Sequence, residues 1–180
     1  MSNSSHFYSI PQEGAPKILH VVTEISKGDF NKYEYNKDLG ILELDRVLHG
    51  PTFYPVNYGD VPGTWNEGDN DPLDAVVFST GKILPGVLVH GRVIGLMEMD
   101  DNGEEDHKIL CVNDRDPRYD YIKTVDDLPE GKRKDLKNFF EIYKIAQTGR
   151  DSVKVGNFLG PEAAYKLIEE SIEAYKKKFC

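Results

Sequence analysis

Apolar and polar residues alternate in short stretches along the first two thirds of the chain, a pattern typical of strands that are buried on one face. The predicted strands cover residues 18–25, 32–35, 41–48, 75–78, 87–97, 108–112 and 153–158. A turn over residues 36–40 pairs the second strand with the third, so Arg46 is expected to return beside Lys32 and Glu34. Asn102-Gly103 predicts a hairpin between the fifth and sixth strands.

Helical periodicity appears only in the last third of the chain. One helix is predicted from about Glu130 to Thr148, ended by Gly149, and Gly160-Pro161 opens a second that runs to about Lys177. The apolar side of the first is expected to comprise Leu136, Phe139, Phe140, Tyr143 and Ile145. Strands first and helices last indicate an α+β fold, with an antiparallel sheet or small barrel that carries helices on one side.

The chain reads as one domain over residues 1–180, with residues 1–16 as an irregular lead-in. The formal net charge of −9 argues against nonspecific nucleic-acid binding, which needs a basic surface. Two cysteines make no disulfide framework, and neither a signal peptide nor a membrane span is visible, so we expect a cytoplasmic protein that does not enter membranes. The five histidines have no metal-binding helical spacing, so a zinc site is not expected.

An acidic stretch, Glu67 to Asp74, leads into the apolar run at 75–78. Gly68 and Pro72 predict a loop here, which would place Asp69, Asp71 and Asp74 at the lip of a buried strand. Clustered carboxylates repel one another unless a cation holds them together, and oxygen ligands of this kind suit Mg²⁺, Mn²⁺ or Ca²⁺. A solvated acidic turn is the alternative interpretation.

A second acidic segment and a set of scattered basic residues narrow the chemistry. The segment from Asp101 to Asp106 is followed closely by Lys108. This segment and the acidic stretch at 69–74 both adjoin strands, so the two clusters are able to converge on two or more divalent cations. The basic and phenolic residues that would complete a polyanion site are Lys32, Arg46, Tyr58, Lys108, Tyr143 and Lys144. With no Gly-x-Ser-x-Gly or phosphate-binding glycine loop, a metal-activated water is the expected nucleophile.

The sequence disfavours each of three rival interpretations of the acidic loop. An EF-hand needs Asp or Asn and then Gly at its fifth and sixth positions, where this chain has Leu73 and Asp74. A sugar-nucleotide site of the Asp-x-Asp type is present at Asp69 to Asp71, but such sites usually need a doubly wound domain. An aspartyl-phosphate phosphatase would place its first Asp directly after an apolar strand, which residues 65–68 do not provide.

The run Gly68 to Asp74 closely resembles the signature of the first family of soluble inorganic pyrophosphatases. Further motifs that resemble this family follow in the family's order along nearly the whole chain. They are Glu24, Lys32-Tyr33-Glu34, Asp45-Arg46, Phe53-Tyr54-Pro55, Asn57-Tyr58-Gly59, Asp101 to Lys108, and Phe140 to Lys144. The resemblance implies a five-stranded OB-like barrel, mostly antiparallel and flanked by two main helices, that hydrolyses diphosphate with several Mg²⁺ ions, for which Mn²⁺ or other divalent ions substitute. The prokaryotic length further implies a homohexamer.

The same resemblance assigns roles residue by residue. Asp69, Asp74, Asp101 and Asp106 resemble metal ligands, Glu34 an assisting ligand, and Asp71 the acceptor of the water's proton. Lys32, Arg46, Tyr58, Lys108, Tyr143 and Lys144 resemble the phosphate binders, and Glu24 and Tyr54 supporting residues. Asp100 competes with Asp101 for one role, and the family spacing to Gly103 and Asp106 favours Asp101. A non-catalytic OB-type binding module, with acidic turns that cations stabilise, is the second hypothesis.

Overall fold

The computed structural model describes residues 9–36, 39–68 and 70–180. Asp69, the first eight residues of the expected lead-in and two residues of the turn expected at 36–40 therefore lie outside the described residues. Residues 9–17 contain turns but neither helix nor strand. In the described part of the chain, no helix combines the length and apolar character that crossing a membrane requires.

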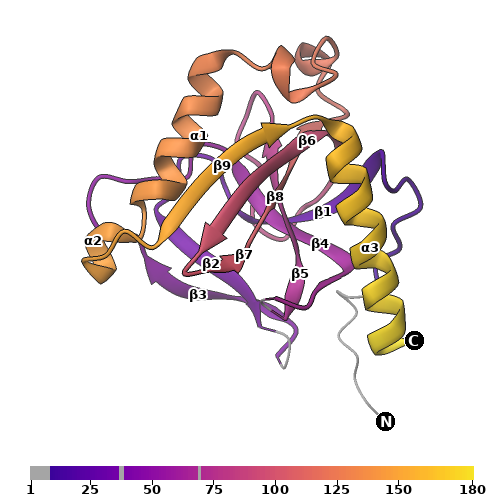
Figure 1. Cartoon of the computed structure of the whole chain (residues 1–180), viewed down its shortest axis with the longest axis horizontal. Coiled ribbons are helices and arrows are strands. Elements are labelled where there is room, and N and C mark those ends of the chain that lie inside the picture. The colour runs from indigo at the N-terminus through magenta and orange to yellow at the C-terminus, as the bar shows by residue number, and fades with distance from the viewer. Residues whose placement is uncertain (1–8, 37–38, 69) are drawn as a thin grey trace.

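Five strands close into a barrel in the order β1-β4-β5-β8-β6, and pairing between β1 and β6 closes it (Figure 1). Their bounds are β1 Ile18–Ile25, β4 Asn57–Asn66, β5 Asp71–Phe78, β6 Leu88–Asp101 and β8 Lys108–Asn113. The β5–β8 pair is parallel and the other four pairings are antiparallel. This arrangement confirms the expected barrel, which is mostly antiparallel.

Four further strands lie outside the five-stranded barrel. β7 (Glu104–Glu105) and β9 (Val153–Leu159) both pair with β6, while β2 (Asn31–Asn36) and β3 (Ile41–Val47) form a separate two-stranded sheet. In that hairpin Lys32 pairs with Arg46, and Glu34 pairs with Glu43. The predicted return of Arg46 beside the Lys32 strand is confirmed.

Two helices flank the barrel at different places, whereas the sequence predicted helices on one side. α1 (Glu130–Ile142) packs against β9, and α3 (Pro161–Phe179) packs against β4 and β6 (Figure 1). Gly160 caps α3 with Pro161 in its first turn, as predicted, and the face with Ala164, Ile168 and Ser171 is buried. The remaining helical elements are short: η1 Pro117–Tyr119, η2 Val125–Asp127 and α2 Ile145–Thr148.

The predicted helix over residues 130–148 is interrupted, which is a correction. α1 ends at Ile142 and α2 begins at Ile145, so Tyr143 and Lys144 lie between them. Gly149 ends α2 in the left-handed conformation with φ of 67°, as expected of a helix-ending glycine. Ile145 lies outside α1 and is 38% exposed, so it does not belong to the apolar side predicted for this helix.

β4 and the start of β5 are corrections to the predicted strands. β4 is absent from the prediction, because Pro62 and Gly63 disrupt the local pattern, and Gly63 has a left-handed φ of 74°. β5 begins at Asp71 and not at 75, so Asp71, Pro72 and Asp74 lie in a strand and not in a loop. Proline is tolerated there because β4 bulges opposite it: the pairing register jumps between Val61 and Asn66.

Alternate side chains of the central strands enter two separate apolar clusters, as the pleat of a strand requires. One cluster joins the barrel to α1 and contains Val76, Phe78, Leu110 and Val112. The other joins the barrel to α3 and contains Ala75, Val77, Ile109 and Cys111. Both faces of β5 and β8 are therefore buried, which holds the ends of these strands rigidly.

β4 and β1 approach each other closely at Gly59. A Cβ at this position would lie 2.0 Å from the carbonyl oxygen of Val22 and 2.7 Å from the Cα of Thr23. Because both atoms belong to the backbone of β1, we expect Gly59→Ala to lower the free energy of unfolding by at least about 2 kcal/mol in urea denaturation. Gly131→Ala is the control, because no atom lies within 4 Å of its Cβ and alanine favours the helix. Equal stability of the two variants would contradict this close approach.

Candidate active site

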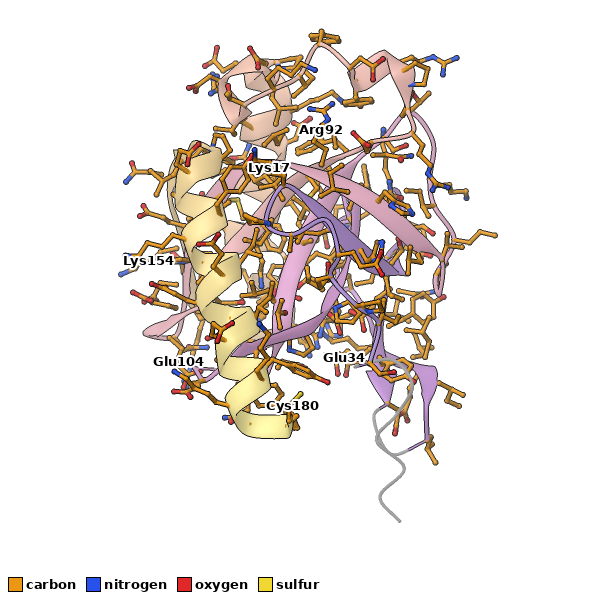
Figure 2. The ribbon with its side chains drawn as sticks, turned by 90° about the vertical axis from the view of Figure 1, so that its right-hand side faces the viewer. Lys17, Glu34, Arg92, Glu104, Lys154 and Cys180 are labelled. Atoms are coloured by element: carbon orange, nitrogen blue, oxygen red, sulfur yellow. The ribbon has the colours of Figure 1, made fainter. Side chains whose placement is uncertain are left out.

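Two adjoining cavities share Lys32, Tyr58 and Asp74, and have volumes of about 490 and 270 Å³. The larger is also lined by Arg46, Tyr54, Asp101, Asn102, Glu104, Glu105, Asp106, Lys108, Phe140, Tyr143 and Lys144. The smaller is also lined by Glu24, Glu34, Tyr35, Asp60 and Asp71. Every site residue expected from the sequence lines one of the two, except Asp69, which lies outside the described residues. Glu34 and Glu104 lie toward the same end of the molecule, and Arg92 lies at the other end (Figure 2).

The ammonium of Lys108 lies between two carboxylates and donates hydrogen bonds to Asp74 and Asp106. The parallel pairing of β5 with β8 aligns Ala75 with Ile109, which brings Asp74 next to Lys108. Lys108 is only 2% exposed. Burial alone would lower the pKa of Lys108, but Asp74 and Asp106 outweigh it and raise this pKa, so the lysine stays charged.

At Asp106 the effect of burial on the pKa outweighs the effect of the neighbouring lysine. Burial, opposed by Lys108 and reinforced by Asp74, raises the pKa of Asp106. The negative charge on this part of the cavity is therefore costly, and a bound cation would stabilise it. The carboxylate donor set of Asp74, Asp101 and Asp106 fits a hard divalent ion. Within the described residues, no three side chains of the metal-binding types converge closely enough to surround one ion.

The bulge in β4 lets residues on both faces of β5 reach the cavities. Thr64 is buried in the bulge, where its Oγ1 accepts a hydrogen bond from the Leu73 amide at 2.8 Å and donates one to the Val61 carbonyl at 2.6 Å. These bonds replace ladder pairing at the point where Asp71 and Asp74 both line the smaller cavity. Asp60 pairs with Asp74 across the two strands and lines the same cavity.

Asp60 is a site residue that the sequence reasoning missed. It follows Tyr58 by two positions, so both would have been assigned to one face if β4 had been predicted as a strand. Phe140 and Asn102 were not singled out as lining residues either. Phe140 looked like an ordinary apolar residue of the helix, and Asn102 like the residue of a hairpin turn, which its φ of 58° confirms.

Aromatic rings form one wall of the larger cavity. Tyr54 lies 5.5 Å from Tyr58 between ring centroids and 4.7 Å from Phe139, and Tyr143 stacks on Phe139 at 5.2 Å. Burial, reinforced by the charge of Asp74, raises the pKa of Tyr58 well above its usual value. Burial likewise raises the pKa values of Tyr54 and Tyr143. These three phenols therefore keep their protons at neutral pH and are able to donate hydrogen bonds to an anion.

The β2–β3 hairpin brings a second group of charges. Lys32 pairs with Glu34 and lies 3.5 Å from Asp45, and Arg46 also pairs with Asp45. The Nε of Arg46 is buried and has no hydrogen-bond acceptor among the residues that the structure describes. Such a donor beside a cavity fits an incoming anion, because a buried unpaired donor costs free energy.

Lys144 reaches the cavity because the helical segment is interrupted. Its ammonium pairs with Asp101 at the end of β6, and this non-local contact fixes the position of the residues between α1 and α2. The structure also separates the two neighbouring aspartates. Asp101 lines the large cavity, whereas Asp100 accepts a hydrogen bond from the Gly103 amide at 2.9 Å and lines a different hollow with Glu98 and His107.

Glu24 lies at the back of the smaller cavity. It is buried, and it accepts a hydrogen bond from the Tyr35 amide at 2.7 Å, which ties β1 to the hairpin. Burial, with a further contribution from the Asp74 charge, raises the pKa of Glu24 to about 8. Its carboxyl group is therefore mostly protonated at neutral pH.

Comparison with known proteins gives a consistent picture. A family model described as inorganic pyrophosphatase matches residues 21–176. The chain is 45% identical over 162 residues to an inorganic pyrophosphatase of Geobacillus stearothermophilus, which covers 90% of this chain and 96% of that protein. It is similar to the crystal structure of the inorganic pyrophosphatase from Thermus thermophilus, with a TM-score of 0.89, 43% identity and coverage of 94% and 98%. The Helicobacter pylori enzyme structure gives a TM-score of 0.87 at 38% identity, with coverage of 93% and 98%.

The buried ammonium of Lys108 makes a stability prediction. Lys108→Met keeps the aliphatic stem but leaves Asp74 and Asp106 facing each other without a cation, so we expect the free energy of unfolding to fall by about 3 kcal/mol without divalent ions. Urea denaturation in the presence of a chelator measures this loss. Lys134→Met is the matched control, because it breaks an ion pair with Glu130 that is exposed to solvent and therefore weak. A loss at Lys108 no larger than the control's would contradict the assignment.

Proposed function

This chain belongs to the inorganic pyrophosphatase family, and from that premise we propose that its two cavities form the site at which diphosphate is hydrolysed to two phosphates. Hydrolysis of diphosphate is the activity of the family, so the chain is a hydrolase of a phosphoric anhydride. The observation that carries the placement is the composition of the cavity walls. Carboxylates and cationic groups line the same two adjoining cavities, as hydrolysis of a metal-bound polyanion requires.

Asp74, Asp101 and Asp106 hold the divalent cations in this proposal, with Asp69 as a further ligand and Glu34 as an assisting one. Mg²⁺ is the expected ion because carboxylate oxygens suit hard cations, and Mn²⁺ has the same ligand preference. When bound, the ions lower the pKa of a coordinated water and withdraw charge from the phosphoryl oxygens. The raised pKa of Asp106 supports the assignment, because its burial leaves a charge that an ion would stabilise.

Six residues bind the two phosphates in the proposal: Lys32, Arg46, Tyr58, Lys108, Tyr143 and Lys144. The Nε of Arg46 is a buried donor with no acceptor among the described residues, and the phenols of Tyr58 and Tyr143 donate without adding charge. In the structure, the ammonium groups of Lys32, Lys108 and Lys144 pair with carboxylates. Once cations neutralise those carboxylates, the same ammonium groups are available to phosphate oxygens.

Asp71 accepts the proton of the attacking water in this scheme. It lines the smaller cavity with Asp74, three positions away on the same strand, which places it near a proposed metal ligand. Glu24 and Tyr54 are supporting residues in the proposal, because their contacts hold neighbouring elements of the site together. Glu24 ties β1 to the hairpin through the Tyr35 amide, and Tyr54 packs against Tyr58 and Phe139.

A homohexamer in the cytoplasm remains a prediction from the resemblance. The net charge of −9 and the free cysteines Cys111 and Cys180 are compatible with it. Sedimentation equilibrium would measure the subunit number directly.

The proposed activity is tested by phosphate release from diphosphate. We expect release with Mg²⁺ and almost none when a chelator replaces the ion, because without a cation the carboxylates repel the substrate. Colorimetric phosphate detection during the reaction measures both conditions. No release at millimolar Mg²⁺ from a folded chain would refute the proposal.

Asp71→Asn tests the proton acceptor. The amide cannot take up the water's proton, so we expect kcat to fall by about 10²- to 10⁴-fold with the thermal midpoint nearly unchanged. Asp135→Asn is the control, since Asp135 is exposed on α1 and lines neither cavity. Turnover by Asp71→Asn within a few-fold of the unaltered chain would remove Asp71 from this role.

A further inference from the structure

The last turn of α3 lies against the end of β4 and the turn that follows it. The Nζ of Lys178 lies 3.8 Å from the centroid of the Trp65 ring, and the ring of Phe179 meets Trp65 edge to face at 5.1 Å. Lys178 also donates a hydrogen bond to the Oδ1 of Asn70 at 3.4 Å. One exposed lysine therefore contacts both sides of the β4–β5 turn.

Local hydrogen bonds give this turn a defined backbone. Asn70 has a left-handed φ of 60°, a conformation that asparagine adopts more readily than other non-glycine residues. Hydrogen bonds to Asn66 close the turn: the Asn70 amide donates to the Asn66 carbonyl at 3.0 Å, and the Gly68 amide donates to its side chain at 3.1 Å. The contacts of Lys178 with Asn70 and Trp65 add a tie from α3 to this turn.

Asn70 directly precedes Asp71, so the conformation of the turn sets the direction from which β5 starts. The first pairing of β5 with β4 is between Asp71 and Asn66, the residue that closes the turn. Contacts that fix Asn66 and Asn70 therefore also fix the backbone of Asp71. In Figure 2 the end of α3 at Cys180 lies toward the same end of the molecule as Glu34, a cavity residue.

The neighbouring lysines of the last helical turn behave differently. All three cations, Lys176 to Lys178, suit the negative end of the helix dipole. Lys176 pairs with Glu173 on the same helix at 2.7 Å. Lys178, by contrast, contacts the turn. A lysine that served only the helix end would not need to lie over an aromatic ring.

We propose that Lys178, with Phe179 and Trp65, forms a positioning cluster that holds the β4–β5 turn in the conformation that directs Asp71 into the cavity. The role in catalysis rests on the proposed function, whereas the support of the turn does not. Lys178 is a positioning residue, because it acts on the turn through Asn70 and Trp65 and lines neither cavity.

Amide hydrogen exchange of the full chain, measured by mass spectrometry without metal, tests the support of the turn. We expect Lys178→Met to speed exchange of the amides at residues 66–71 by about tenfold and to leave exchange of β8 unchanged. Lys178→Arg keeps the cation and the donor and should retain slow exchange. Lys166→Met is the matched control, because Lys166 is exposed on the same helix and pairs only with Glu170 in the described chain, at 3.8 Å.

Steady-state kinetics on diphosphate at saturating Mg²⁺ test the role in positioning. We expect Lys178→Met to lower kcat by about three- to tenfold with KM within twofold, and Lys178→Arg to restore kcat. Phe179→Leu, a second variant of the cluster, should change exchange and kcat in the same direction.

Several results would overturn the proposal: unchanged exchange at residues 66–71, faster exchange across the whole chain, an effect equal to that of Lys166→Met, or faster exchange of the turn with unchanged kcat. If the unaltered chain releases no phosphate, the proposed function fails. Exchange at residues 66–71 then decides by itself whether the cluster holds the turn.

Discussion

The charged group of Lys108, held between Asp74 and Asp106, is the interaction on which the cavity depends. Carboxylates this close repel one another, and burial makes each charge more costly. The pair of strands that brings them together, β5 and β8, is the parallel pair of the barrel. Both faces of these strands are covered by apolar residues, so their ends cannot relax apart to relieve the repulsion. The packing of the barrel thus holds the carboxylates in place, and the lysine makes that placement tolerable.

The same arrangement of opposite charges recurs around the cavity. Ion pairs join Lys32 to Glu34, Arg46 to Asp45, and Lys144 to Asp101. These cationic groups are therefore engaged by neighbouring carboxylates. In the proposed site, an anion that enters alone would compete with these carboxylates for the same cationic groups. A divalent cation bound to the carboxylates would remove this competition, so the two kinds of ligand would favour each other's binding.

Local patterns predicted the elements whose contacts are regular, and failed where distant contacts decide. β1 and α3 follow directly from alternation and from the Gly160-Pro161 start. β4 was missed because Pro62 and Gly63 lie in its bulge, and Asp60 was missed with it. Lys144, in the break between α1 and α2, pairs with Asp101, 43 residues away, a contact that no local pattern contains. Residue types and the family resemblance predicted which side chains gather at the cavities, while their roles stay predictions, and Asp69 lies outside the described residues.

Closure of the barrel pairs residues 18–22 with residues 88–92, and the cavity collects side chains from Glu24 to Lys144. Pairings between such distant segments form slowly, because the chain loses the entropy of a long loop before the contacts stabilise it. During synthesis, therefore, the early carboxylates leave the ribosome well before the residues that complete their site. We expect tight cation binding to appear in one late step of folding, so divalent ions would stabilise the finished barrel without guiding the nascent chain toward it.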